Sequence, residues 1–318
     1  MIKKGTEKIN KVLKELKNEK IHTWFDLGLF IDRFKEERIT SAFKGNDKAF
    51  GSYLQKGGVA FVTFYFTIDG ITVETEKYAK TFKNLYPNIP IHFVAGDIKQ
   101  EADELIPKDA FKKVIPEMEA FDAWPLYKDF FKIRMERGSK EYNELIGKFW
   151  KEVLVLVEKL GTYIEENDIS LLYLINVCSN PGNVSLALAT VLISEYLGIP
   201  VINNNHDFYW EGGNREVEIK KKGLKKGPRD FFFHNAHVGE FFSLIEMVYP
   251  WESRSWMNVN INKIQQNHII DINGHNPANV ALIGTAVDTK THQMSKRDII
   301  KAFMQVSAIF ANKKDTIT

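Results

Sequence analysis

The sequence predicts an α/β fold with a doubly wound, mostly parallel, Rossmann-like sheet. Short runs of apolar, β-branched and aromatic residues have the length and composition of strands. They occupy residues 58–66, 89–95, 171–175, 199–202, 256–261 and 280–283. Segments with helical periodicity separate most of these runs, and parallel strands need such crossover connections. Polar residues directly follow several runs, which is typical of parallel sheets that bind ligands at their strand ends.

Residues 1–50 are expected to form an amino-terminal helical extension, and residues 51–318 the Rossmann-like domain. Between residues 6 and 18, four apolar side chains share one helical stripe: Ile9, Val12, Leu13 and Leu16. Residues 23–34 carry a wider apolar face. Such faces bind membranes or partners in some proteins. Packing against the main sheet is more common, and it is the interpretation that we favour.

A turn and a helix are predicted after the first strand. Asp69 and Gly70 form the turn, and Thr72 is expected to cap the helix that follows. Glu74 and Glu76 are assigned to the first turn of this helix, where the positive end of its dipole favours acidic side chains. The Asp-Gly turn is either purely structural or a place where backbone amides approach a phosphate.

The rest of the chain alternates between helices and the strands above. Helices are predicted at residues 122–136, 141–166, 185–196, 237–248, 262–270 and 295–311. Residues 96–125 are interpreted as irregular and acidic, with short helical pieces. A run of lysines between residues 220 and 226 is interpreted as an exposed loop, with binding of an anionic substrate group or an acidic lipid as the alternative.

Composition limits the class of protein. The chain has 318 residues, a net charge of +2 and one cysteine, Cys178. So small a charge does not fit a dedicated nucleic-acid-binding protein, and one cysteine excludes an intrachain disulfide or a cysteine-based zinc site. We find no signal peptide and no apolar run of the roughly 18 residues that a spanning helix needs. We therefore expect a cytoplasmic protein, and peripheral contact with a membrane surface stays open.

The densest group of polar and aromatic side chains follows strand 199–202. It comprises His206, Asp207, Tyr209, Trp210, Glu211 and Arg215. The imidazole of His206 can serve as an acid, a base or a hydrogen-bond donor to a substrate. Alternatively, it pairs with Asp207 to hold the loop. Glu211 and Arg215 either form an ion pair, or Arg215 binds a carboxylate or phosphate of the substrate.

Several common types of site find no support in the motifs. The sequence has no Walker loop, no G-x-G-x-x-G turn and no G-x-S-x-G elbow, which removes the usual ATPase, dinucleotide and serine-hydrolase interpretations. His234 and His237 could share one side of a helix, but a single pair is thin support for a metal site, and we expect none. A hydrolase that uses His206 and Asp207 would lack a nucleophile or a metal.

Five segments, taken in order, are similar to motifs of a known family. They are Thr67-Ile-Asp-Gly-Ile-Thr-Val-Glu74; Asn176 with Pro181-Gly-Asn-Val-Ser-Leu-Ala-Leu-Ala189; His206-Asp-Phe-Tyr-Trp-Glu211 with Arg215; Val259-Asn-Ile-Asn-Lys-Ile-Gln265; and Val280-Ala-Leu-Ile-Gly-Thr-Ala-Val-Asp288. Together they resemble the amino-terminal, acceptor-side domain of retaining GT-B glycosyltransferases of the family 4, or group 1, type. The last segment is similar to the hinge that leads into the second domain of that family.

The resemblance implies transfer of a sugar from a nucleotide-sugar donor to a sugar or lipid acceptor, with retention at the anomeric carbon and no obligatory metal. It implies that the loop of Asp69 and Gly70 approaches the donor diphosphate. His206 would lie against the donor sugar and stabilise an oxocarbenium-like transition state as an oriented dipole. The acceptor or sugar pocket would contain Asn176, Asp207, Tyr209, Trp210, Glu211 and Arg215, and the two aromatic rings would offer stacking surfaces.

The sequence also departs from the family pattern. The second domain, with its E-x7-E pair of carboxylates, has no counterpart, so we expect the chain to be inactive alone and to need a carboxyl-terminal domain in cis or in trans. The loop contains Trp-Glu-Gly-Gly-Asn-Arg where relatives often have Trp-Glu-Arg, and Thr285-Ala replaces a common Pro-Asn. The alternative function is a non-catalytic α/β module that recognises a small sugar or an anion at the same strand ends.

Overall fold

The computed structural model describes residues 6–37, 47–131, 133, 135–211 and 247–285. Its centre is a seven-stranded sheet in the order β5-β3-β1-β6-β7-β8-β9, and every neighbouring pair is parallel. The strands are β1 (Val59–Val62), β3 (Ile91–Ala95), β5 (Phe111–Val114), β6 (Leu171–Ile175), β7 (Val201–Asn205), β8 (Trp256–Asn260) and β9 (Val280–Leu282). The predicted doubly wound α/β fold is confirmed, and each predicted run overlaps a strand of this sheet. The run at 58–66 is not one strand, because it divides into β1 and the short β2 (Tyr65–Phe66), which pairs with β4 (Asp97–Ile98) in a separate sheet.

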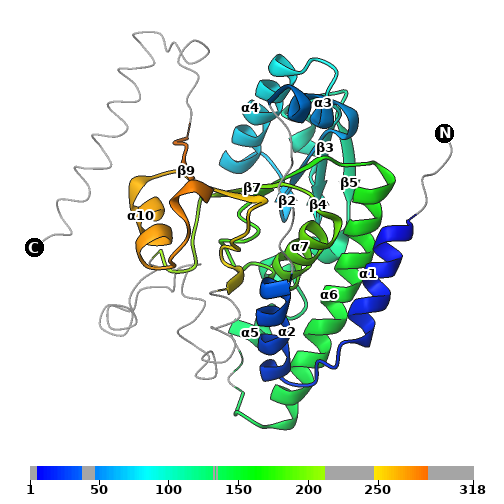
Figure 1. The fold of residues 1–318 in the computed structure, drawn as a ribbon, viewed down its shortest axis with the longest axis vertical. Coiled ribbons are helices and arrows are strands. Elements are labelled where there is room, and N and C mark those ends of the chain that lie inside the picture. Colours follow the sequence, from blue (N-terminus) through cyan, green and yellow to red (C-terminus); the bar gives the residue numbers. More distant parts are fainter. Residues whose placement is uncertain (1–5, 38–46, 132, 134, 212–246, 286–318) are drawn as a thin grey trace, which may run out of the picture. The chain divides into compact units, whose positions relative to one another are not determined.

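Helices cover both faces of this sheet (Figure 1). One face carries α1 (Glu7–Asn18), α2 (Trp24–Glu37), α6 (Lys140–Glu166) and α7 (Val184–Leu197), and the opposite face carries α3 (Asp47–Gly57) and α4 (Gly70–Leu85). The helix α10 (Lys263–Asp271) connects β8 to β9. Shorter elements are β2 (Tyr65–Phe66), β4 (Asp97–Ile98), α5 (Tyr127–Phe131) and the 3-10 turns η1 (Gln100–Glu104), η2 (Pro116–Met118), η3 (Phe121–Ala123) and η4 (Pro277–Asn279).

Strand β1 shows how one sheet supports two cores. Successive side chains of a strand point to opposite faces. Val59 and Phe61 pack with residues of α3 and α4, whereas Ala60 and Val62 pack with residues of α1, α2, α6 and α7. All four side chains are fully buried. The amphipathic helices α1 and α2 are therefore core-packing elements, as the sequence predicted.

The order of the strands defines the place where a ligand is expected. From β1 the chain adds β3 and β5 on one side of the sheet, and it adds β6 to β9 on the other side. The strand order therefore reverses between β1 and β6. In open α/β sheets, ligands bind outside the carboxyl ends of the strands at such a switch point, because the connecting segments leave in opposite directions there.

Four predicted local features are corrected by the structure. Residues 96–125 were expected to be irregular but contain β5, whose lysines and exposed Phe111 hide the strand pattern in the sequence. The helix predicted at 122–136 shortens to α5, preceded by the 3-10 turn η3. Asp69, rather than Thr72, caps α4, which begins at Gly70, so Glu74 and Glu76 lie beyond its first turn. The predicted helix at 295–311, most of the one at 237–248 and the lysine run lie outside the described residues.

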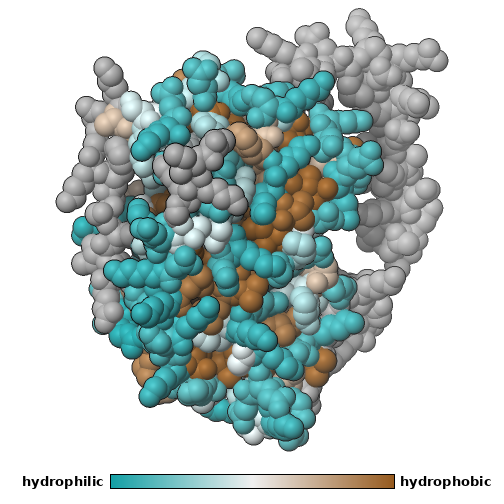
Figure 2. Space-filling view, turned by 90° about the vertical axis from the view of Figure 1, so that its right-hand side faces the viewer, coloured by the Kyte–Doolittle hydropathy of each residue, from teal (hydrophilic) through white to brown (hydrophobic). Residues whose placement is uncertain are grey.

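The surface on the side of α1, α6 and β5 is mostly hydrophilic, with separate hydrophobic areas between the polar residues (Figure 2). Strand β5 forms an edge of the sheet and exposes Phe111 and Val114 next to two lysines, Lys112 and Lys113. Lysine on an edge strand opposes pairing with another chain. None of the described helices combines the length and apolarity that crossing a membrane requires.

Candidate functional site

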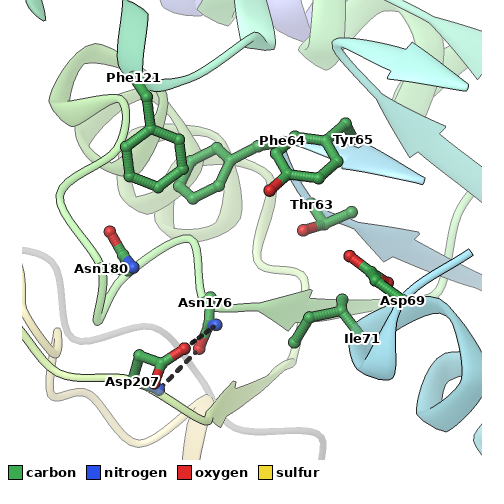
Figure 3. A pocket seen from close by; sticks show the side chains of 9 residues that line it. All are labelled: Thr63, Phe64, Tyr65, Asp69, Ile71, Phe121, Asn176, Asn180 and Asp207. Carbon is green, nitrogen blue, oxygen red and sulfur yellow. Dashed lines mark hydrogen bonds between the residues drawn. The ribbon is translucent and has the colours of Figure 1, made fainter. Parts of the chain in front are cut away.

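A pocket of about 340 Å³ opens at the switch point between β1 and β6. It is lined by Thr63, Phe64, Tyr65, Asp69, Ile71, Phe121, Asn176, Asn180 and Asp207 (Figure 3). These residues come from the segment after β1, which includes β2, from the start of α4, from the turn η3, and from the loops after β6 and β7. The structure therefore brings together three of the residues that the sequence singled out, namely Asp69, Asn176 and Asp207.

Asn176 holds the loops after β6 and β7 together. Its side-chain oxygen accepts hydrogen bonds from the backbone N–H groups of His206, at 2.8 Å, and Asp207, at 3.1 Å. Its side-chain nitrogen donates to Oδ2 of Asp207 at 3.3 Å. The backbone of Asn176 is left-handed, with φ of 60°, a conformation that asparagine tolerates better than most residues. One amide thus fixes where the Asp207 carboxylate stands.

Asp69 joins the pocket to the start of α4. Its Oδ1 accepts the backbone N–H of Thr72 at 2.8 Å, which is a standard side-chain cap of a helix amino terminus. The next residue, Gly70, has open space beside it, because a Cβ there would meet no atom within 4 Å. The carboxylate of Asp69 and the carboxylate of Asp207 stand on opposite sides of the pocket (Figure 3).

Aromatic rings form another wall of the pocket (Figure 3). The rings of Phe64 and Phe121 meet edge to face, with centroids 6.1 Å apart. Phe121 has a positive φ of 55°, an uncommon conformation for a bulky residue, and such backbone strain is concentrated at functional sites. Tyr65 completes the wall, and burial, with a further contribution from the charge of Asp69, raises the pKa of its hydroxyl.

His206 is not among the residues that line the pocket. Its Nδ1 is 3.7 Å from Oε2 of Glu74, a residue of α4, and both side chains are largely buried. Its Nε2 is buried and has no hydrogen-bond partner in the structure. The other oxygen of Glu74 accepts the hydroxyl hydrogen of Tyr78 at 2.6 Å. Burial, together with this hydrogen bond, raises the pKa of Tyr78 to about 12.

The remaining predicted site residues are placed elsewhere. Tyr209 is buried, with its ring edge-on to Tyr249. Trp210 stacks on Phe208 and on His268, with centroid distances of 4.9 and 3.8 Å. These two rings therefore pack within and against the loop after β7, and neither is among the residues that line the pocket.

Glu211 is likewise used within its own loop. Its carboxylate accepts hydrogen bonds from the backbone N–H of Phe208, at 2.8 Å, and from Nε2 of Gln265, at 2.9 Å. The loop after β7 is thereby tied to α10. Arg215 lies outside the described residues, so the predicted choice between an ion pair and substrate binding stays open.

Sequence reasoning missed several residues that line the pocket. Thr63 and Phe64 follow β1 and Tyr65 begins β2, but the sequence predicted one strand as far as residue 66, so the rule that sites form at strand ends did not point to them. Asn180 lies in the loop after β6 and so shares the strand-end position of Asn176, whereas Phe121 had no such signal, because only the folded chain brings η3 next to that loop. Within the described part of the chain, no three His, Cys, Asp or Glu side chains are grouped so that they could hold a metal ion.

The comparisons with known proteins find distant structural similarity. No protein-family model matches the sequence, and no curated protein matches it. Among solved structures, the chain is similar to the crystal structure of a glycosyltransferase from Rickettsia africae ESF-5, at 9% identity and a TM-score of 0.38. The similarity covers 78% of this chain and 49% of that one, so the chain spans about half of the other protein's length. This similarity is too distant to assign an activity.

Proposed function

We propose that this protein is the acceptor-binding half of a retaining glycosyltransferase, which transfers a sugar from a nucleotide-sugar to an acceptor hydroxyl. The observation that carries the proposal is the pocket at the switch point. It combines carboxylates and carboxamides, which hydrogen-bond to sugar hydroxyls, with aromatic rings, which pack against the apolar face of a sugar ring. The ordered resemblance of the sequence motifs to GT-B glycosyltransferases supports the same conclusion.

In this proposal the acceptor sugar lies in the pocket, with a hydroxyl directed toward Asp207. Asn176 keeps this carboxylate in place through the hydrogen bond at 3.3 Å. During transfer, the bond between the anomeric carbon and the donor phosphate oxygen breaks. A bond to the acceptor oxygen forms on the same face, and the acceptor proton moves to the leaving phosphate.

The donor is proposed to approach along Gly70 and His206. Gly70 leaves the amino terminus of α4 open to a ligand on the side where a Cβ would meet no atom. The Nε2 of His206, which is buried and unpartnered in the structure, would be uncovered as the donor binds and would stabilise developing charge as an oriented dipole. The nucleotide would be bound by a second domain, in cis or in trans. The cytoplasmic location, the absence of a metal requirement and peripheral membrane contact belong to the same proposal.

The test is a glycosyl-transfer assay on the longest naturally encoded protein that contains this chain. It uses a panel of nucleotide-sugars and uncharged acceptors, with the anomeric configuration of the product read by NMR. We expect transfer with retention, and a loss of at least about tenfold in kcat for His206→Ala. His22→Ala is the matched control, because His22 is exposed. Absence of transfer with every donor, or full activity in His206→Ala, would refute the proposed transferase activity. Sugar binding without transfer would favour the non-catalytic module.

A further inference from the structure

The polar groups of the pocket mostly accept hydrogen bonds. The hydroxyl of Thr63 has one hydrogen, and it donates this hydrogen to the backbone oxygen of Ile175 at 3.1 Å. The oxygen of Thr63 is therefore left as an acceptor. Asp69 and Asp207 add two carboxylates. An ionised carboxylate accepts hydrogen bonds and has no hydrogen to donate.

Asn180 supplies an independent sign that a ligand belongs here. Its Oδ1 is buried and has no hydrogen-bond partner among the described residues, although the residue lines the pocket. A buried carbonyl oxygen without a partner costs free energy, and a ligand that donates a hydrogen bond to it would remove this cost. This unpartnered oxygen therefore favours a ligand with an O–H or N–H group that can donate a hydrogen bond to it.

Charge leads to the same conclusion. Among the residues that the structure describes, the pocket lining contains two carboxylates and no lysine, arginine or histidine. The side-chain N–H₂ group of Asn176 already donates one hydrogen bond to Asp207. The side-chain donors left among these lining residues are the amide of Asn180 and the hydroxyl of Tyr65, whose pKa is raised by burial. A phosphate or carboxylate would bring negative charge and acceptor oxygens toward groups of the same kind.

We propose that this pocket takes an uncharged or amine-bearing sugar and rejects a phosphorylated one. Sugar hydroxyls and an ammonium group donate hydrogen bonds to Thr63, Asp69, Asn180 and Asp207, and an ammonium group also lies favourably on the aromatic wall. The donor diphosphate must then lie outside this pocket. Naming the sugar as the acceptor rests on the proposed function, whereas the selectivity of the pocket rests on its lining alone.

The test is a binding titration with matched ligands. Three sets are built on glucose, galactose and mannose, and each set contains the parent sugar, its 2-amino-2-deoxy form and its 6-phosphate. Binding is followed by calorimetry and by NMR shifts of pocket residues. In the set that binds best, we expect the parent and amino sugars to bind at least about tenfold tighter than the 6-phosphate. Equal or tighter binding of the 6-phosphate, or absence of pocket binding by all nine ligands, would overturn the proposal.

Charge-neutral variants locate the source of the selectivity. Asp69→Asn keeps a good helix cap, and Asp207→Asn keeps the shape of the side chain. In the double variant we expect the preference against the 6-phosphate to fall below about threefold. Asp103→Asn, at an exposed carboxylate paired with Lys112, is the control and should keep the full preference. Unchanged selectivity in the double variant would overturn the proposal.

The two proposals fail in different ways. Selective binding of uncharged or amino sugars without any transfer would refute the proposed transferase activity but support the proposed selectivity of the pocket. Transfer to phosphorylated acceptors in preference to uncharged ones would refute the proposed selectivity but support the proposed transferase activity.

Discussion

The backbone N–H of His206 donates a hydrogen bond of 2.8 Å to the side-chain oxygen of Asn176, and so links the ends of β6 and β7. The two residues lie far apart in the sequence but follow neighbouring parallel strands. Because the same oxygen also accepts the N–H of Asp207, one side chain orders the loop that carries both predicted site residues. The ends of β6 and β7 therefore fix this side of the pocket.

Asn176→Ala should destabilise the protein and weaken ligand binding. The substitution removes an acceptor shared by two backbone N–H groups and places alanine at a positive φ. We expect a loss of about 1–3 kcal/mol in the free energy of unfolding, measured by urea denaturation with tryptophan fluorescence. The control Asn180→Ala removes a side chain whose oxygen has no partner, so it should cost less than about 0.5 kcal/mol. Equal stability of the two variants would contradict the role of Asn176.

Gly70→Ala should leave stability unchanged or raise it by up to about 1 kcal/mol, because a Cβ at this helical position meets no atom within 4 Å. If a ligand approaches this backbone, the added methyl group should nevertheless weaken donor binding. Gly57→Ala is the contrast, since its Cβ would lie 1.7 Å from the backbone oxygen of Asp168 and should be strongly destabilising. Thermal unfolding separates the two variants, and full donor binding by Gly70→Ala would exclude a close approach there.

Glu74 is expected to position the imidazole of His206. Glu74→Gln keeps an acceptor for the hydroxyl of Tyr78 but removes the charge 3.7 Å from Nδ1 of His206. We expect kcat for transfer to fall by about tenfold with little change in the acceptor KM. Glu76→Gln is the matched control on the same helix, where the carboxylate pairs with Lys80. If both variants kept full kcat, Glu74 would have only a structural role.

His92 should make the protein less stable in mild acid. Burial lowers the pKa of His92 from 6.5 to about 4, and the ring is stacked on Phe111 and hydrogen-bonded to the hydroxyl of Tyr163. As the pH falls from 6.5 to about 4, the unfolded chain binds a proton there that the folded chain does not, so this contribution to stability is lost.

The measurement is urea unfolding as a function of pH in wild type and His92→Gln. We expect a smaller loss of stability between pH 6.5 and about 4 in the variant, although its stability at neutral pH is lower. His22→Gln, at an exposed histidine, should keep the wild-type slope. The same slope in His92→Gln and wild type would show that another group titrates.

Much of the fold was readable from the sequence because the central strands are buried on both faces and appear as continuous apolar runs, as in residues 171–175. Strand β5 was missed because it lies at the sheet edge and has two consecutive lysines between Phe111 and Val114, which breaks the apolar pattern of a strand. Asp69, Asn176 and Asp207 were found because each follows a strand. Contacts between distant segments, such as Glu74 with His206, depend on the order of strands and on how α4 packs, which no local pattern encodes.

The most direct test of the central claim is a crystal structure of the protein with an uncharged or amino sugar bound. We predict the sugar ring in the pocket between β1 and β6, packed on Phe64 and Phe121, with hydroxyl or ammonium groups donating to Asp207 and to the unpartnered oxygen of Asn180. A sugar that binds elsewhere and leaves this pocket empty would contradict the account.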